Sequence, residues 1–286
     1  MNKLLEIIQE LMEEVIRVFN RQEHYLIYNN LCERCINGRF AMYMQYFISN
    51  SVLSGYLVDV EWDRGMAGND CFKKKYKDGD AYLDLIVHKR GYDSISGYDN
   101  LIVVEMKKEG PDFEEDKERL RDLASVQYGF GYRAGYALRI KNDGIVCEDS
   151  FFLLHEKKRK LCDLFQKVMK KYKNIDRWGH FFDYMDLENI MLARWLSEND
   201  ASSNIKLLEG TRNNYNDRHI WIELSDDEGD TIIDLTGSRF EDCSINTYVG
   251  PMNSFHKSFT NKRIIQSVGG NIEELYSIIK AEIQLE

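Results

Sequence analysis

The chain has 286 residues and a net charge of −10, because 48 acidic side chains outnumber 38 basic ones. This length predicts two domains, and the negative charge argues against tight, non-specific binding of nucleic acid over the whole surface, although a local basic groove or bound metal ions could offset it. Glutamates interrupt the opening segment, no run of about 20 apolar residues follows, and the six cysteines are irregularly spaced, so we expect a cytoplasmic protein without signal peptide, membrane span or disulfide framework.

The first half of the chain predicts helices that precede and follow a group of short strands. Apolar spacing and polar loops define the elements. In chain order they are expected over residues 3–19 (helix), 30–49 (helix), 56–62 (strand), 81–88 (strand), 101–107 (strand), 112–125 (helix) and 136–140 (strand). Asp112 and Glu115 would open the third helix as a capping box.

The second half begins with a lysine-rich helix, expected over 156–174, that connects the two parts. The elements expected after it lie over residues 186–197 (helix), 205–209 (strand), 218–224 (strand) and 231–235 (strand). We therefore expect two domains, 1–155 and 156–286, each built of a sheet with helices. The fold class is α/β, more exactly stated as α+β, with a mixed sheet in the first domain.

Charged residues interrupt the apolar pattern LIVVEMK at 101–107. Because side chains alternate along a strand, Glu105 and Lys107 point to the same face. Asp84 is the charged residue of the preceding strand pattern. Burying a carboxylate and an ammonium group costs several kcal/mol unless they are paired or bind a metal. The pattern therefore predicts that Asp84, Glu105 and Lys107 form a functional site.

These residue types are the ones that metal-dependent phosphodiester hydrolysis requires. Carboxylates hold Mg²⁺ or Mn²⁺, since hard cations prefer oxygen ligands. Such ions polarise the phosphoryl oxygen and lower the pKa of bound water. A lysine can orient or deprotonate that water and offset charge in the transition state. We expect Asp84, Glu105 and Lys107 to be the catalytic residues, with Asp84 and Glu105 as metal ligands.

The spacing resembles the core motif of the PD-(D/E)xK nuclease superfamily. The segments YLDLIVH at 82–88 and VVEMKK at 103–108 match its D-x(n)-ExK pattern, with Leu83 in place of the proline in the family name. The resemblance covers residues 31–140 and implies a restriction-endonuclease-like mixed sheet flanked by helices. Members often carry a further glutamate near the metal on the first core helix. The matching position is Glu33, which the resemblance implies as a third metal ligand.

The same resemblance implies nucleic acid as the partner, with DNA favoured over RNA. The expected contacts to it are Arg39, Lys108 and Tyr128. Tyr128 stands in the segment QYGFGYRAGY and could instead pack inside the domain. The biological setting that the resemblance implies is DNA restriction, repair or defence against mobile elements.

The second half contains a different constellation. RHIWIEL at 218–224 and TIIDLTGSRF at 231–240 resemble the HxWxE and IDxTxxQF patterns of papain-like and transglutaminase-like cysteine hydrolases. In that family a histidine is the base, an aspartate orients it, and a cysteine at a helix start is the nucleophile. Phe181 stands where that cysteine is expected, so His219 and Asp234 should persist as a structural hydrogen-bonded pair. The resemblance implies a smaller papain-like α+β domain. Without its nucleophile, we expect this domain to recognise a protein partner, a substrate or a companion subunit.

The expected function is therefore a metal-dependent nuclease with a C-terminal recognition domain. One alternative is a non-catalytic binding or regulatory protein built on vestigial nuclease and hydrolase folds. It would keep the sheet but bind no metal at Asp84 and Glu105. Another alternative is a hydrolase that acts through His219. That enzyme would need a nucleophile such as Cys162 or Cys243 in a rearranged topology.

Overall fold

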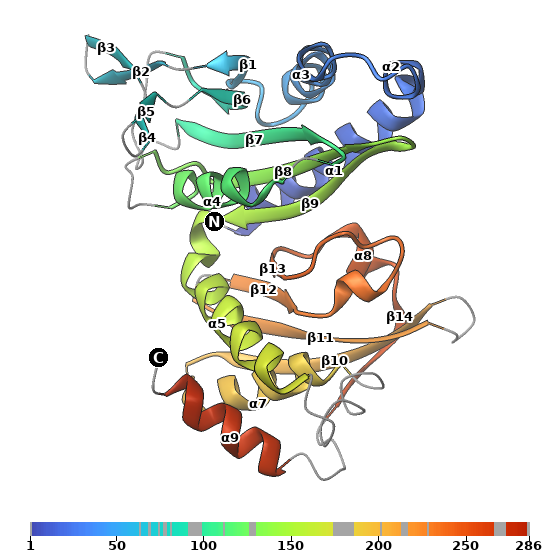
Figure 1. Ribbon diagram of the computed structural model, residues 1–286. Coiled ribbons are helices and arrows are strands. Elements are labelled where there is room, and N and C mark those ends of the chain that lie inside the picture. Colours follow the sequence, from blue (N-terminus) through green and yellow to red (C-terminus); the bar gives the residue numbers. More distant parts are fainter. Residues whose placement is uncertain are drawn as a thin grey trace. The chain divides into compact units, whose positions relative to one another are not determined.

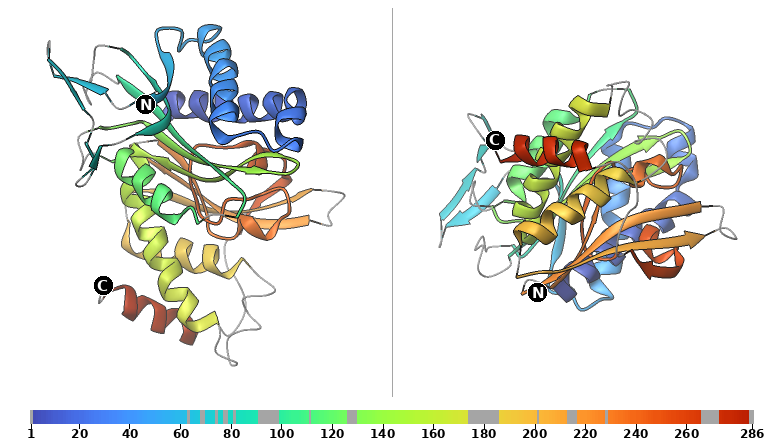
Figure 2. Two further views of the ribbon diagram at one scale, coloured as in Figure 1. Left: turned by 45° about the horizontal axis from the view of Figure 1, so that its top comes forward. Right: turned by 90° about the horizontal axis from the view of Figure 1, so that it is seen from below.

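The computed structural model of the chain is drawn in Figures 1 and 2. It describes residues 2–62, 64–67, 70–73, 75–76, 79–80, 82–90, 99–110, 112–125, 130–173, 186–200, 202–212, 217–227, 229–265 and 273–284. The chain divides into two compact units, an N-terminal unit (Lys3–Leu154) and a C-terminal unit (His155–Glu286). Each contains a five-stranded sheet and helices, which confirms the expected α+β class.

A mixed sheet forms the centre of the N-terminal unit. Its strands lie in the order β1 (Leu57–Trp62), β6 (Leu83–His88), β7 (Asn100–Lys108), β8 (Ala134–Lys141) and β9 (Gly144–Phe152). β7 and β8 run parallel, and the other neighbours run antiparallel. The central strands β6, β7 and β8 are almost wholly buried, which explains their near-continuous apolar sequence. Two short hairpins fall between β1 and β6 in the sequence: β2 (Arg64–Ala67) with β3 (Asp70–Lys73), and β4 (Lys75–Tyr76) with β5 (Gly79–Asp80).

Helices cover both faces of this sheet (Figure 1). They are α1 (Asn2–Gln22), α2 (His24–Tyr28), α3 (Glu33–Ser49) and α4 (Glu114–Leu123). Tyr136 of β8 points towards α1, where its hydroxyl donates to Gln9 Oε1 at 3.1 Å. The next residue, Ala137, packs on the opposite side with α4. α1 and α3 meet through the rings of Phe19 and Phe40, whose centroids lie 5.5 Å apart.

Two helix starts differ from the sequence expectation. The second predicted helix begins at Glu33, because Asn30 adopts a left-handed φ of 50° and separates α2 from α3. The capping box of Asp112 and Glu115 does not form. Asp112 Oδ1 instead accepts the backbone N–H of Glu114, the first residue of α4, at 3.1 Å.

An antiparallel sheet forms the centre of the C-terminal unit. Its strands lie in the order β13 (Tyr248–Gly250), β12 (Gly229–Asp234), β11 (Asp217–Asp226), β10 (Asn204–Arg212) and β14 (Thr260–Ile264). Three longer helices pack on one face: α5 (Glu156–Lys173), α7 (Leu187–Asn199) and α9 (Glu273–Ile283). Short helices complete the unit: η1 (Leu153–His155), which crosses the boundary between the units, η2 (Gly237–Arg239) and α8 (Ser254–Lys257).

Strand β11 serves both faces of this sheet. Ile220, Ile222 and Leu224 join the apolar core with α5, α7 and α9. His219 and Trp221 point to the other face, where Trp221 contacts the rings of His256 and Phe259. The alternation therefore places an aromatic and polar cluster on the side of the sheet that carries α8 (Figure 1).

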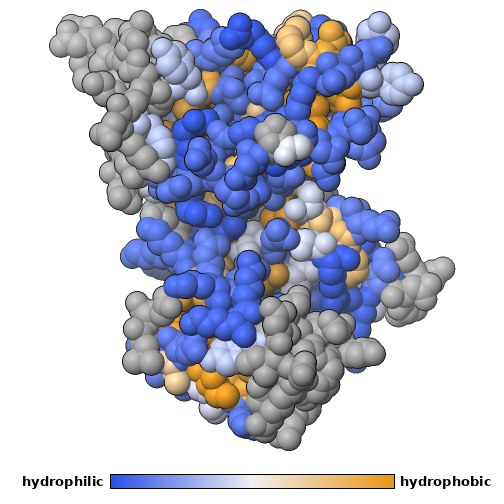
Figure 3. All heavy atoms as spheres, viewed as in Figure 1, coloured by the Kyte–Doolittle hydropathy of each residue, from blue (hydrophilic) through white to orange (hydrophobic). Residues whose placement is uncertain are grey.

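The face of the molecule shown in Figure 3 is mainly hydrophilic, and the cysteines with described side chains are not paired in disulfides. Hydrophobic side chains are visible on this face around α3. Among the described helices, none combines the length and the apolar character needed to cross a membrane. The cysteines whose side chains are described are free thiols.

Gly210 of β10 is a position where a side chain cannot fit. It pairs with His219 of β11, and an added Cβ would lie 2.8 Å from Phe259 Cβ and 2.8 Å from the Trp221 ring. Both neighbours are buried and cannot move aside cheaply. We therefore expect Gly210→Ala to lower the free energy of unfolding of the C-terminal unit by about 1–3 kcal/mol, measured by urea denaturation.

Gly38→Ala is the control for this experiment. Gly38 lies inside α3, and an added Cβ would meet nothing within 4 Å. Replacing a helical glycine in open space should leave stability unchanged or raise it by up to about 1 kcal/mol. Equal stabilities of Gly210→Ala and the unaltered protein would contradict the packing described.

Candidate functional site

Asp84 and Glu105 face each other across two neighbouring strands. The antiparallel register pairs Leu85 of β6 with Val104 of β7, which brings Asp84 opposite Glu105 on one face of the sheet. Asp84 Oδ2 accepts the backbone N–H of Met106 at 2.8 Å. The structure thus brings together two of the residues that the sequence motif singled out.

Both carboxyl groups are more difficult to ionise than free ones. Glu105 is only 2% exposed, and this burial raises its pKa well above the usual range, with the nearby charge of Asp84 adding to the effect. Burial also raises the pKa of Asp84, an effect that the hydrogen bond from Met106 partly offsets. The positive charge near Asp84 and Glu105 therefore does not fully offset the cost of ionising both buried carboxyl groups.

Arg119 bonds Glu105 of this pair, and Lys107 bonds Asp116, an acid that the sequence analysis did not select. Arg119 of α4 places Nη2 2.9 Å from Glu105 Oε2, and its Nε donates to Glu105 Oε1 at 3.0 Å. Lys107, two residues beyond Glu105, donates from Nζ to Asp116 Oδ2 at 2.7 Å. Arg119 also bonds Asp116 at 2.9 Å. Asp116 and Arg119 form an i, i+3 pair on α4, and from the sequence such a pair looks like part of a solvated helix face.

Glu33 reaches the same region from the first turn of α3. Its Oε2 accepts the backbone N–H of Lys108 at 3.1 Å, just beyond Lys107. Burial raises the pKa of Glu33, and the charge of Asp84 raises it further, so the two carboxylates are near enough to interact. Within the described residues, Glu33, Asp84 and Glu105 do not bring their oxygens within 4.8 Å of one another as a group of three.

Of the three residues expected to contact nucleic acid, the structure places one beside the acidic cluster. Arg39 is exposed on α3, and its Nε donates to Glu23 Oε1 at 2.7 Å, so the structure shows it in an ion pair with Glu23. Lys108 lies next to the acidic cluster and donates from Nζ to Asn30 Oδ1 at 2.7 Å. Tyr128 lies outside the described residues.

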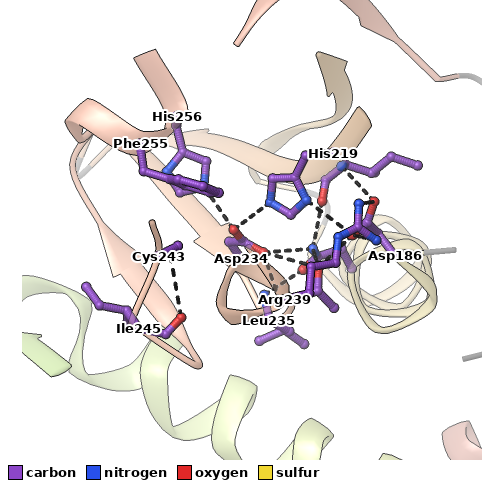
Figure 4. A network of polar contacts seen from close by, with 12 residues as sticks. Asp186, His219, Asp234, Leu235, Arg239, Cys243, Ile245, Phe255 and His256 are labelled. Atoms are coloured by element: carbon purple, nitrogen blue, oxygen red, sulfur yellow. Dashed lines mark hydrogen bonds and ion pairs between the residues drawn. The ribbon is translucent and has the colours of Figure 1, made fainter. Parts of the chain in front are cut away.

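In the C-terminal unit, the structure brings His219 and Asp234 together (Figure 4). His219 Nε2 lies 2.7 Å from Asp234 Oδ2, on the antiparallel neighbour β12. The other ring nitrogen, Nδ1, lies 3.2 Å from Oδ1 of Asp186, which precedes α7. Although burial disfavours the charged ring, the two carboxylates raise the pKa of His219 to about 9. A protonated ring held at both nitrogens has no lone pair and cannot act as a general base.

Three further residues hold this network in place. Asn189 of α7 is fully buried and donates to Ile220 O at 2.8 Å and to Asp234 Oδ1 at 3.0 Å, while its own Oδ1 accepts Leu235 N–H at 2.8 Å. Arg239 places Nη1 2.9 Å from Asp186 Oδ1. His256 of α8 places Nε2 3.0 Å from Asp234 Oδ2.

Sequence analysis missed most of this second network. Asp186 was placed at the start of a predicted helix, but its role as a partner of His219 follows only from the tertiary fold. His256 stands in the segment NSFHKSF, which has no spacing relation to His219. An acid directly before a helix with a polar residue three positions later is the one local signal, and it is shared by many ordinary helix starts.

No described cysteine is placed to act as a nucleophile for His219. Cys162 is buried in the apolar core, and burial raises its pKa to about 12. Burial likewise raises the pKa of Cys243 to about 12, and its Sγ lies 3.8 Å from Ile245 O. Phe181 lies outside the described residues. Within the described residues, both nitrogens of His219 face carboxylates instead of a thiol.

The buried amide of Asn189 is the part of the network that can be tested through stability. Asn189→Ala would leave the Leu235 N–H and the Ile220 carbonyl without a partner in a dry interior. We expect it to lower the free energy of unfolding of the C-terminal unit by about 2–4 kcal/mol, followed by tryptophan fluorescence in urea.

The matched control is Asn199→Ala on the same helix. Asn199 is exposed, and the one partner of its side chain among the described residues is the Trp195 carbonyl, at 2.8 Å. Its removal should change stability by less than about 0.5 kcal/mol. Similar effects of the two substitutions would show that the buried network does not stabilise the unit.

Comparisons with known proteins give no match to this chain. No family model matches the sequence, and no curated protein or solved structure is similar to it at a meaningful level. The likeness to PD-(D/E)xK nucleases and to papain-like hydrolases therefore rests on the motif residues alone. The function of the protein has to be inferred from the geometry of its two polar clusters.

Proposed function

We propose that the N-terminal unit hydrolyses phosphodiester bonds of nucleic acid, DNA in preference to RNA, with Mg²⁺ or Mn²⁺ as cofactor. The observation that carries the proposal is the opposition of Asp84 and Glu105 in a buried setting that raises the pKa of both. Carboxylates in such a setting gain stability when positive charge is added. Their oxygen atoms are the ligands that hard divalent cations prefer.

Each residue of the cluster has a role in this proposal. Asp84 and Glu105 would hold the cofactor, with Glu33 as a ligand directly or through water. The bound ion supplies a polarised phosphoryl oxygen and water of lowered pKa. Lys107 would turn from its present partner to orient or deprotonate the attacking water. Arg119 would release Glu105 and offset charge on the phosphate.

A rival function is supported by one observation. Arg119 and Lys107 already engage carboxylates, at 2.9 Å from Glu105 and 2.7 Å from Asp116. A complete salt-bridge network can serve the fold alone. A non-catalytic binding or regulatory protein would keep this network intact and would bind no divalent ion.

For the C-terminal unit we propose recognition instead of catalysis. The arrangement of His219 supports this role, because both ring nitrogens are already engaged. A cavity of about 930 Å³ lies on this unit and offers a place for a ligand or a protein segment. Its lining combines the charged side chains of Arg212, Arg239, Asp217, Glu241 and Asp242 with the ring of Phe240, a combination suited to a polar or aromatic group.

The nuclease proposal predicts separate effects of ligand and lysine substitutions. Asp84→Asn and Glu105→Gln should abolish Mn²⁺ binding in calorimetry and lower cleavage of fluorescent DNA by more than about 100-fold. Lys107→Gln should retain Mn²⁺ binding but lose cleavage, since the lysine acts on water and not on the metal. Parallel single-stranded, double-stranded and RNA substrates establish the preference.

Glu115→Gln is the control, because Glu115 is an exposed carboxylate on α4 close in sequence to the cluster. It should bind Mn²⁺ and cleave like the unaltered protein. Absence of both Mn²⁺ binding and cleavage in the unaltered protein would favour the non-catalytic rival. Undiminished cleavage by Asp84→Asn and Glu105→Gln would place the active site elsewhere.

A further inference from the structure

Three ligand atoms of the C-terminal unit converge on one point. They are His219 Nε2 from β11, Asp234 Oδ2 from the end of β12, and His256 Nε2 from α8 (Figure 4). All three lie within 4.8 Å of one another, and within the described part of the chain they are the one such group of three. The three side chains are buried, so the point is shielded from bulk water.

The remaining polar atoms of these residues are held from outside the cluster. Nδ1 of His219 faces Asp186, and Nδ1 of His256 faces Asn253 Oδ1 at 2.6 Å. Asp234 Oδ1 accepts the backbone N–H of Thr236 at 2.9 Å and the amide of Asn189. Metal-binding histidines and carboxylates are oriented by outer partners in this way.

His256 presents a conflict that a cation would remove. Asn253 Oδ1 also accepts the backbone N–H of His256 at 3.0 Å, so it is the oxygen of that amide, and Nδ1 of the ring must carry the hydrogen. On a neutral ring, Nε2 is then a lone pair that faces Asp234 Oδ2 at 3.0 Å. Two acceptors at this distance repel each other.

We propose that His219, Asp234 and His256 bind a divalent transition-metal ion, Zn²⁺ in first place, through Nε2, Oδ2 and Nε2. Two imidazoles and one carboxylate form a donor set typical of Zn²⁺ and Fe²⁺. Coordination by His219, Asp234 and His256 displaces one proton, from Nε2 of the His219 ring, while Nδ1–H keeps its hydrogen bond to Asp186. This site is independent of the nuclease proposed for the other unit.

Gly237 leaves room beside the carboxylate, and Cys243 adjoins the same space. A Cβ on Gly237 would lie 2.7 Å from Asp234 Oδ2 and 3.0 Å from Cys243 Sγ. The thiol and the carboxylate oxygen thus border one small space. Cys243 is therefore the neighbouring donor for a fourth position, and its thiol would release a second proton on coordination.

The test measures Zn²⁺ binding by calorimetry in the full chain carrying Asp84→Asn and Glu105→Gln, so that the acidic cluster of the N-terminal unit does not contribute. About one equivalent of Zn²⁺ should bind per chain and release protons, seen as a heat that depends on the buffer. Asp234→Asn and His256→Gln, added one at a time, should each weaken binding by more than about 100-fold. His24→Ala is the control, because His24 is an exposed histidine of α2 and should have no effect.

The visible absorption of bound Co²⁺ reports coordination without a substitution of His219, Asp234 or His256. The chain loaded with Co²⁺ should show the visible absorption of a four-coordinate ion, and a sulfur-to-cobalt band lost in Cys243→Ala would identify the fourth ligand. Binding of Zn²⁺ that persists unchanged in Asp234→Asn and His256→Gln would overturn the proposal. So would Zn²⁺-equilibrated protein that holds no metal and shows protons on both ring nitrogens of His256 by nitrogen-15 NMR.

Discussion

The cost of burying negative charge is the constraint on which both halves of this protein depend. An ionised carboxylate that leaves water loses several kcal/mol of solvation unless cations or hydrogen-bond donors replace it. The N-terminal unit buries Glu105 beneath α4, and the C-terminal unit buries Asp234 between two histidines. Each carboxylate organises the elements around it, since the strand that carries it must lie where a helix can bring it a partner.

The two units differ in how far nearby positive charge and hydrogen bonds offset the cost of burying these carboxylates. Around Asp84 and Glu105 the compensation is incomplete, and burial leaves the pKa of both carboxyl groups raised. Around Asp234 it is more than complete: although burial opposes ionisation, the charge and hydrogen bond of His219 hold the pKa of Asp234 well below the usual range. An under-compensated pair can accept an exchangeable hard cation during catalysis. A carboxylate that stays ionised and is oriented by hydrogen-bond donors is better suited to tight binding of a transition-metal ion.

The sequence predicts elements well wherever one physical signal dominates. The buried strands β6 and β7 and the amphipathic helix α1 follow from apolar runs and helical spacing alone, and their observed bounds lie within a few residues of the expected ones. Strand β9 was missed because Glu148 and Asp149 interrupt its pattern. As the last strand in the order, it exposes one edge and tolerates such charges.

Some residues of the candidate sites can be recognised from a local sequence signal, and others cannot. Asp84, Glu105 and Lys107 could be selected because they break apolar strands, and alternation assigns their face. Arg119, Asp186 and His256 could not, because each reaches its partner only through packing of a distant element. Their local sequences are those of ordinary helices and loops, and no periodicity distinguishes a helix-surface arginine that meets a buried glutamate from one that meets water.

The most direct measurement of the central claim is anomalous X-ray scattering from crystals grown with Mn²⁺. The account predicts an anomalous peak bridging Asp84 and Glu105, with oxygen ligands at about 2.0–2.6 Å, and the Arg119 guanidinium displaced from Glu105. A map without a peak at this position, in which Arg119 still bonds both Glu105 and Asp116, would contradict it and leave the cluster as a salt-bridge network that serves the fold.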